Sequence, residues 1–166
     1  MLQMKLCGDL VLREKCTPVD TITSEILEIL DEMVEMMDEQ HGVGLAAPQV
    51  GVSKRFLVMK NPANDEVIKM INPVILSRSE EMVVKEEGCL SVLGPDDLPV
   101  YADVVRPAKV TVQWTGIDGK QNVADMSGLR ARIVQHETDH LDGILFIDYL
   151  SSAKREMIMN KVRRRK

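Results

Sequence analysis

The sequence is poor in cysteine and histidine and has no long apolar run, and each shortage excludes a class of protein. Its three cysteines, Cys7, Cys16 and Cys89, are odd in number and lack the spacing of a disulfide framework, which favours a reducing compartment, the cytoplasm. No apolar run is long enough to cross a bilayer, and the first residues contain no apolar core followed by a cleavage site. We therefore expect no export signal and no membrane as a partner.

An excess of positive charge is also missing. The 166 residues carry 21 lysines and arginines against 26 aspartates and glutamates, a net charge of -5, which argues against DNA as a direct partner. The sign changes only at the end of the chain, where residues 161–166 read KVRRRK. Such a basic end is typical of a solvated helix end and, in fewer proteins, of a contact with RNA or another polyanion.

Two of the three histidines stand four residues apart in QHETDH, residues 135–140. On a helix, His136 and His140 lie one turn apart on the same face, and Glu137 lies at the edge of that face. Two imidazoles can share a metal ion, and the carboxylate can act as general base on a water rather than as a ligand. The segment therefore predicts a catalytic metal site whose third ligand comes from elsewhere in the chain.

The shortage of histidine limits the choice of that third ligand. Zinc peptidases with this motif take it from a downstream histidine or glutamate, and neither stands here in a recognisable pattern. Cys89, in EEGCLS at 86–91, remains as the candidate, because it follows a glycine and a carboxylate pair. A thiolate and two imidazoles would leave a tetrahedral ion one open position for water. Two alternatives stay open: another metal-dependent amidase or peptidase, and a structural site closed by His41.

The hydrophobic pattern predicts an α+β fold. Apolar residues at helical spacing predict three helices, at 23–40, 127–143 and about 151–164. Strand-like segments between them are predicted at 55–60, 67–72, 74–85, 109–114 and 121–126. We expect antiparallel β-sheets packed around a central metal-binding helix, with an N-terminal helix and a C-terminal helix. With neither repeats nor a linker, residues 1–166 are expected to form a single catalytic domain.

Three segments resemble the signature segments of peptide deformylases, in the same order and with comparable separations. They are GVGLAAPQ at 42–49, EGCLS at 87–91 and QHETDH at 135–140. The resemblance extends over almost the whole chain. Members of that family remove the formyl group from the N-terminal methionine of new bacterial and organellar polypeptides. The resemblance therefore implies nascent formyl-Met polypeptides as substrates, and it suggests the ribosome as a partner of the basic C-terminal end.

The resemblance also implies the roles of the metal-binding residues. It assigns Cys89, His136 and His140 as ligands of one divalent metal ion, Fe2+, and Glu137 as the general base. The donor set by itself suits Zn2+, Ni2+ or Co2+ as well as iron, so the choice of Fe2+ depends on the resemblance alone.

Further roles follow for the first two signature segments. By resemblance, the side-chain amide of Gln49 and the backbone N–H of Leu90 donate to the negative charge that develops on the formyl oxygen. The backbone of Val43, Gly44 and Leu45 can pair with an extended peptide whatever its sequence. An enzyme that serves every new polypeptide needs such indifference.

The remaining expectations concern the surroundings of the site. Leu129 and Ile133, one and two turns before His136, are candidates for the methionine pocket and equally for plain core. Glu87 and Arg106 are expected to form an ion pair that supports the Cys89 segment. Residues 92–105 form a longer connection than in many members of the family, which leaves the peptide preference open.

Overall fold

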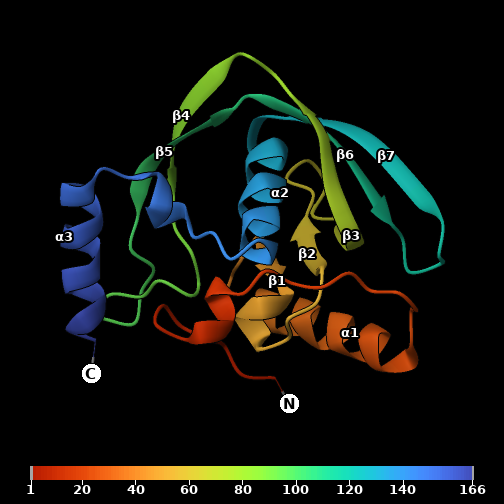
Figure 1. The fold of residues 1–166 in the computed structure, drawn as a ribbon, viewed down its shortest axis with the longest axis horizontal. Helices are drawn as coiled ribbons and strands as arrows, with labels where there is room; N and C mark the ends of the chain where they lie inside the picture. Colours follow the sequence, from red (N-terminus) through yellow and green to blue (C-terminus); the bar gives the residue numbers. More distant parts are fainter. Residues whose placement is uncertain (1, 166) are drawn as a thin grey trace.

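Antiparallel strands form two sheets around a central helix in the computed structural model, which describes residues 2–165 (Figure 1). The helices are α1 (Ser24–Glu39), α2 (Gly128–Leu141) and α3 (Ser152–Arg163), with short 3-10 helices η1 (Leu10–Arg13), η2 (Ala47–Val50) and η3 (Phe146–Tyr149). The strands are β1 (Gly44–Ala46), β2 (Phe56–Lys60), β3 (Val67–Arg78), β4 (Met82–Glu87), β5 (Ala102–Pro107), β6 (Lys109–Thr115) and β7 (Gln121–Ser127). The expected α+β class is confirmed.

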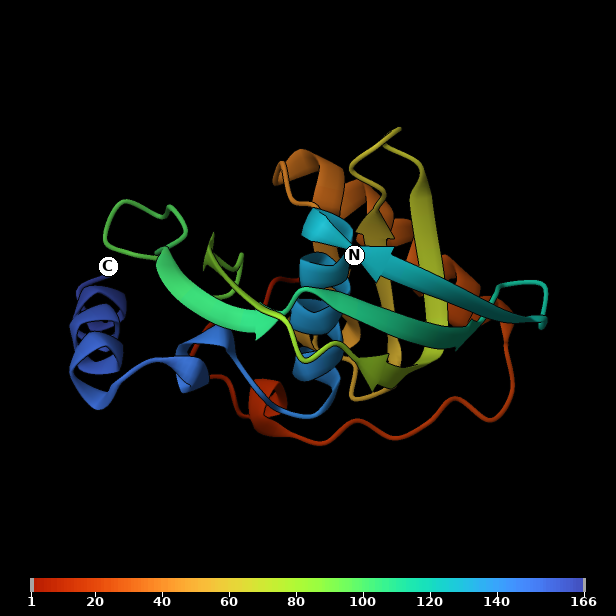
Figure 2. The same cartoon turned by 90° about the horizontal axis from the view of Figure 1, so that it is seen from above.

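The larger sheet has five strands in the order β1-β2-β3-β6-β7, and β4 and β5 form a separate two-stranded sheet. Helix α2 contacts every strand of the larger sheet, and its side chains also bond to the backbone of β4 and β5. In both views it runs between the two sheets (Figures 1 and 2). Within the described residues, no helix combines the length and the apolar character needed to cross a membrane.

Strand β2 is buried on both faces, because α1 and α2 cover opposite sides of the larger sheet. Leu57 and Met59 belong to the cluster packed against α2, whereas Phe56 and Val58 belong to the cluster packed against α1. Successive residues of a strand point to opposite faces, so a strand covered on both sides needs an unbroken apolar run. Burying each of these side chains contributes about 1.5–3 kcal/mol to the stability of the fold. Their packing therefore fixes the sheet surface against which α2 lies.

Helix α1 lies where the sequence predicts it. At its start, the side chain of Thr23 accepts a hydrogen bond from the N–H of Ile26 at 3.3 Å. At its end, His41 takes the left-handed conformation with φ 53°, and the N–H of Gly42 donates to the carbonyl of Met37 at 2.8 Å. This Schellman-type closure turns the chain directly into β1, beside the candidate site.

One strand prediction is wrong and strand β5 was missed, and each error has a physical reason. The segment 74–85 is not one strand: its first part continues β3, and its last part is β4 in the other sheet. Pro73 lacks an N–H, and β3 accommodates it beside a register shift in its pairing with β6. Strand β5 was not predicted, because its inward positions include Arg106, a buried cation that breaks the apolar alternation.

The end of α2 provides a test of close packing between segments. Gly143 has φ +73°, and a Cβ there would lie 2.6 Å from the carbonyl oxygen of Arg13. We predict that Gly143→Ala lowers the free energy of unfolding by more than about 2 kcal/mol, because the left-handed backbone costs about 1–2 kcal/mol and the Arg13 segment must also move. Gly119→Ala is the matched control, since Gly119 has φ +79° and no atom within 4 Å of its Cβ position. Urea denaturation measures both losses, and equal losses would contradict the close approach.

Candidate metal centre and active site

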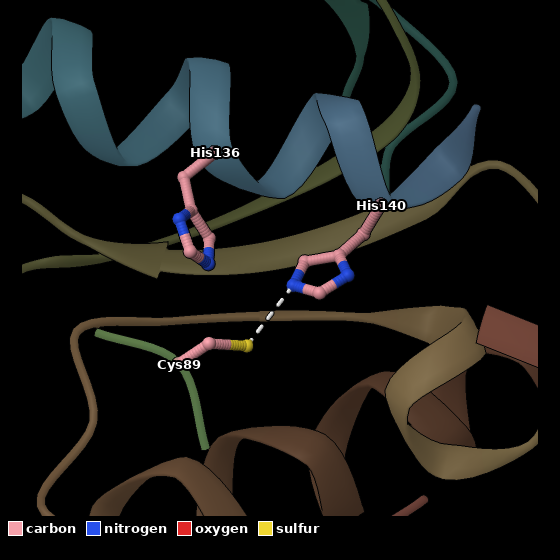
Figure 3. Close-up of side chains that lie close together, drawn as sticks. All are labelled: Cys89, His136 and His140. Atoms are coloured by element: carbon pink, nitrogen blue, oxygen red, sulfur yellow. Dashed lines mark hydrogen bonds between the residues drawn. The ribbon is translucent and has the colours of Figure 1, made fainter. Parts of the chain in front are cut away.

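Cys89, His136 and His140 point their donor atoms into one common space (Figure 3). The three ligand atoms lie within 4.8 Å of one another, and Nε2 of His140 is 3.3 Å from Sγ of Cys89. The two histidines come from successive turns of α2, whereas Cys89 follows the end of β4. All three side chains are buried. Among residues 2–165, no second group of three such donors is found.

This donor set fits a divalent transition metal. Donors bound to one ion at about 2.0–2.3 Å lie at most about 4.6 Å apart, so small adjustments of the side chains suffice. His41 is exposed at the end of α1 and does not belong to the group, which removes the basis for a structural site closed by that residue. Oε2 of Glu137 is buried and has no hydrogen-bond partner in the described part of the chain. A polar atom left free beside three ligands is where a water or substrate atom would bind.

Glu87 orients His136. Its carboxylate accepts a hydrogen bond from Nδ1 of His136 at 2.8 Å and pairs with Arg106 through two contacts of 2.6 and 2.9 Å. A bond at Nδ1 leaves Nε2 free to face the metal site. Burial alone would raise the pKa of Glu87, but the hydrogen bonds from His136 and Arg106 lower it to about 2. The carboxylate therefore stays ionised and holds the imidazole in one orientation.

Two members of this network were not predicted from the sequence. Arg132 donates to Glu87 at 2.5 Å and to a backbone carbonyl in each of β4 and β5. Asp139 accepts a hydrogen bond from Arg106 at 2.8 Å. They stand four residues before and three residues after His136, so they lie near the face of α2 that carries His136. This spacing is the sequence signal from which they could have been predicted.

Glu137 is buried against the backbone of β1. Its side chain is buried, and burial raises its pKa to about 7. A Cβ at Gly44 would lie 2.5 Å from Oε1 of Glu137, so the close approach of β1 to α2 requires glycine at this position. A carboxyl group with a pKa near neutrality can both accept and release a proton under physiological conditions.

Gln49 and Leu90 provide donors beside Cys89. Oε1 of Gln49 accepts from the N–H of Ala46 at 2.9 Å, and this bond directs its Nε2 to Oγ of Ser91 at 3.0 Å and Sγ of Cys89 at 3.4 Å. The backbone N–H of Leu90 has no partner among the described residues. Both groups lie next to the thiol, the first as an amide fixed by its hydrogen bonds and the second as a free donor.

A cavity of about 490 Å³ opens in front of these groups. Predicted site residues that line it are Val43, Gly44, Gln49, Glu87, Cys89, Leu90, Leu129, Ile133, His136 and Glu137. Leu45 does not line it, because its side chain is fully buried in the core beneath β1 and its backbone pairs with Val58 of β2. Ile133 is buried and Leu129 is half exposed, so the cavity reaches from the helix interior to the surface.

Strand β1 is the edge strand of the larger sheet on the cavity side. The carbonyl of Val43 accepts from the N–H of Lys60 at 2.9 Å, so the antiparallel pattern directs the N–H and C=O of Gly44 away from β2. Free backbone groups on an edge strand can bind an extended peptide as an additional strand. The edge beside Glu137 is therefore suited to a peptide substrate.

An α+β fold in which a thiol and two imidazoles converge beside a buried carboxylate at the floor of a cavity is that of a metal-dependent hydrolase. The family model described as polypeptide deformylase matches residues 1–156 of the chain. The peptide deformylase of Rhizobium meliloti (strain 1021) is 46% identical over 156 residues, which cover 92% of this chain and 87% of that protein. The peptide deformylase of Halothermothrix orenii is 46% identical over 158 residues, with 95% and 99% covered.

Solved structures agree with this result. The peptide deformylase from Ehrlichia chaffeensis in complex with actinonin has a TM-score of 0.91 at 36% identity, covering 98% of this chain and 96% of that one. The peptide deformylase from Legionella pneumophila has a TM-score of 0.90 at 38% identity, covering 98% and 94%. The chain belongs to the peptide deformylase family, the hydrolases that release formate from N-formylmethionyl polypeptides.

The Glu87 network leads to a prediction about metal affinity. We predict that Glu87→Gln weakens Co2+ binding by about 10- to 100-fold, because the amide no longer fixes His136 and leaves the buried guanidinium group of Arg132 without an anion. Titration with Co2+, followed through the thiolate–cobalt absorption, measures the affinity, and a thermal melt shows whether the variant is folded. Glu80→Gln, at an exposed acid before β4, is the control. Equal affinities of a folded Glu87→Gln and the control would contradict the orienting role.

Proposed function

We propose that Cys89, His136 and His140 hold one divalent metal ion, Fe2+ in the cell, and that Glu137 is the general base with which this chain deformylates nascent polypeptides. The observation that carries the proposal is the convergence of the thiol and both rings beside the buried, unpaired oxygen of Glu137. When bound, such an ion polarises the formyl carbonyl and lowers the pKa of a water. Iron is inferred from the family resemblance, since the donor set also suits Zn2+, Ni2+ and Co2+.

In this mechanism, Glu137 moves the proton. It takes a proton from the water that attacks the formyl carbon and passes it to the amine nitrogen as the carbon–nitrogen bond breaks. The products are formate and a polypeptide with a free N-terminal amine. Its buried position against Gly44 supports this role, because it raises the pKa of the carboxyl group to about 7 and keeps bulk water away.

Gln49 and Leu90 stabilise the charge that develops on the formyl oxygen. The bond from Ala46 fixes the amide of Gln49 in advance, and the Leu90 N–H has no competing partner in the described part of the chain. Donors that are already in position need little reorganisation when the charge forms. Each such donor typically lowers the activation free energy by about 3–4 kcal/mol. Ground-state hydrogen bonds from Gln49 to Cys89 and Ser91 keep this amide at the thiol.

The substrate is bound mainly through its backbone. On the edge strand that contains Val43, Gly44 and Leu45, the free N–H and C=O of Gly44 pair with the extended chain, which requires no particular sequence. The methionine side chain enters between Leu129 and Ile133, which line the same cavity as Cys89 and His136. Binding the methionine by its side chain and the following residues by their backbone explains how the enzyme recognises the first residue and accepts different residues after it.

We propose that this activity belongs to one catalytic domain over residues 1–166, that the protein acts in the cytoplasm, and that it binds the ribosome. The free state of Cys7, Cys16 and Cys89 and the span of the family match support the first two points. The basic end supports the third, although Arg163 and Arg165 pair with acidic side chains and Lys166 lies outside the described residues. Co-sedimentation with ribosomes tests it: a chain that lacks residues 163–166 should bind less, and unchanged binding would remove the proposal.

The central test is hydrolysis of a formyl-Met peptide compared with its acetyl-Met counterpart. We predict a preference for the formyl peptide of more than about 100-fold, because a site built around a hydrogen excludes a methyl group. Glu137→Gln should lower kcat by about 100- to 10,000-fold while the metal content stays unchanged. Formate release and metal analysis after anaerobic purification provide the two readouts.

His41→Ala is the control for metal binding. It should retain the metal, because His41 does not belong to the donor group. Loss of metal on replacing His41, together with full activity of Glu137→Gln, would support a structural site instead. Equal hydrolysis of the acetyl peptide would point to a general amidase or peptidase.

A further inference from the structure

The connection between Cys89 and β5 is a hairpin rather than an open loop. The N–H of Val100 donates to the carbonyl of Val92 at 3.0 Å, and the N–H of Gly94 donates to the carbonyl of Leu98 at 2.9 Å. Val92 and Val100 are buried in the apolar cluster beneath the two-stranded sheet. The hairpin, residues 92–101, is therefore anchored at its base beside the metal-binding thiol.

The tip of the hairpin is also fixed. Asp97 adopts a left-handed conformation with φ 59°, and its carboxylate accepts a hydrogen bond from Nε of Arg165 at 2.6 Å, which ties it to the end of α3. The carboxylate of Asp96 accepts from the N–H of Leu98 at 3.3 Å. Both acidic side chains of the turn are thus engaged within the protein, and the charge of Asp97 is paired.

Three apolar side chains of the hairpin line the active-site cavity. Leu98, Pro99 and Tyr101 line the same cavity as Cys89 and Glu137. Leu98 is 61% exposed and Tyr101 is 58% exposed, so they form its rim and not its floor. Large apolar side chains exposed together at a cavity mouth are characteristic of a binding surface.

The ring of Tyr101 lies directly over the backbone next to the metal-binding thiol. A Cβ at Gly88 would lie 2.5 Å from Cε1 of Tyr101, so glycine at this position lets the aromatic ring pack on the chain one residue before Cys89. An aromatic ring held in this way provides a rigid apolar wall at small entropic cost.

A peptide held by β1, with its formyl group at Cys89 and its methionine between Leu129 and Ile133, leaves the cavity past this rim. From this arrangement, which rests on the deformylase function proposed above, we infer that the hairpin is a specificity element. Leu98 and Tyr101 select polypeptides with a bulky apolar side chain at the second or third position. Because Asp97 is paired with Arg165, the apolar contacts of Leu98, Pro99 and Tyr101 are the main feature that the hairpin presents to a bound peptide.

The test measures kcat/KM for formyl-Met peptides with Leu, Ala or Asp at the second and third positions. The wild type should favour Leu over Ala at one of these positions by about fivefold to tenfold, since the rim is only partly closed. Leu98→Ser should bring this ratio close to about 1. Leu98→Lys should raise the Asp-to-Leu ratio by about fivefold or more, because a cation then faces the peptide.

Leu10→Ser is the matched control, since Leu10 is exposed, lies on η1 and does not line the cavity. It should keep the wild-type ratios. If peptides are hydrolysed but the ratios are equal in the wild type and both Leu98 variants, the inference is overturned while the deformylase function stands. If no formyl-Met peptide is hydrolysed by the wild type, the proposed function fails as well. Thermal melts establish that the Leu98 variants are folded.

Discussion

The buried carboxylate of Glu87 is the group on which the metal centre and the arrangement of the two sheets both depend. It ends β4, accepts hydrogen bonds from Arg106 on β5, and accepts others from Arg132 and His136 on α2. Removing these charges from water costs several kcal/mol for each ion, a cost offset only when all the partners are present with good geometry. The two-stranded sheet therefore has one position relative to α2 at which the network is satisfied.

That position determines where the thiol lies. Cys89 is two residues beyond Glu87. The carboxylate that orients His136 therefore also fixes the position of the short segment that carries the metal-binding thiol. A site assembled from distant segments needs such coupling, because a displacement of one ligand by about 1 Å can remove much of its function. Gln49 adds a contact from η2, which links the same thiol to the larger sheet.

Two glutamates within one small volume have opposite protonation behaviour, and their surroundings explain why. Burial raises the pKa of both, but two guanidinium groups and an imidazole surround Glu87, whose pKa is lowered to about 2. Glu137 lies against the backbone of Gly44, and its pKa rises to about 7. A pair of carboxyl groups with separated pKa values suits two roles, a permanent anion that supports the site and a group that exchanges protons.

Features that are local in sequence were predictable, and most contacts between distant segments were not. The spacing of His136 and His140 fixes their common face on any helix, whereas the pairing of Arg106 with Glu87 could be expected only from the family resemblance, because it joins strands that the tertiary structure brings together. Strand β5 escaped prediction because its inward arginine interrupts the apolar alternation by which a strand is recognised. The hairpin 92–101 carries no periodic pattern, because its residues are fixed by backbone bonds across a turn and by α3. If selectivity lies on this hairpin, as proposed above, it can change without altering the chemistry on the rigid elements beside it, since one catalytic fold can carry different binding loops.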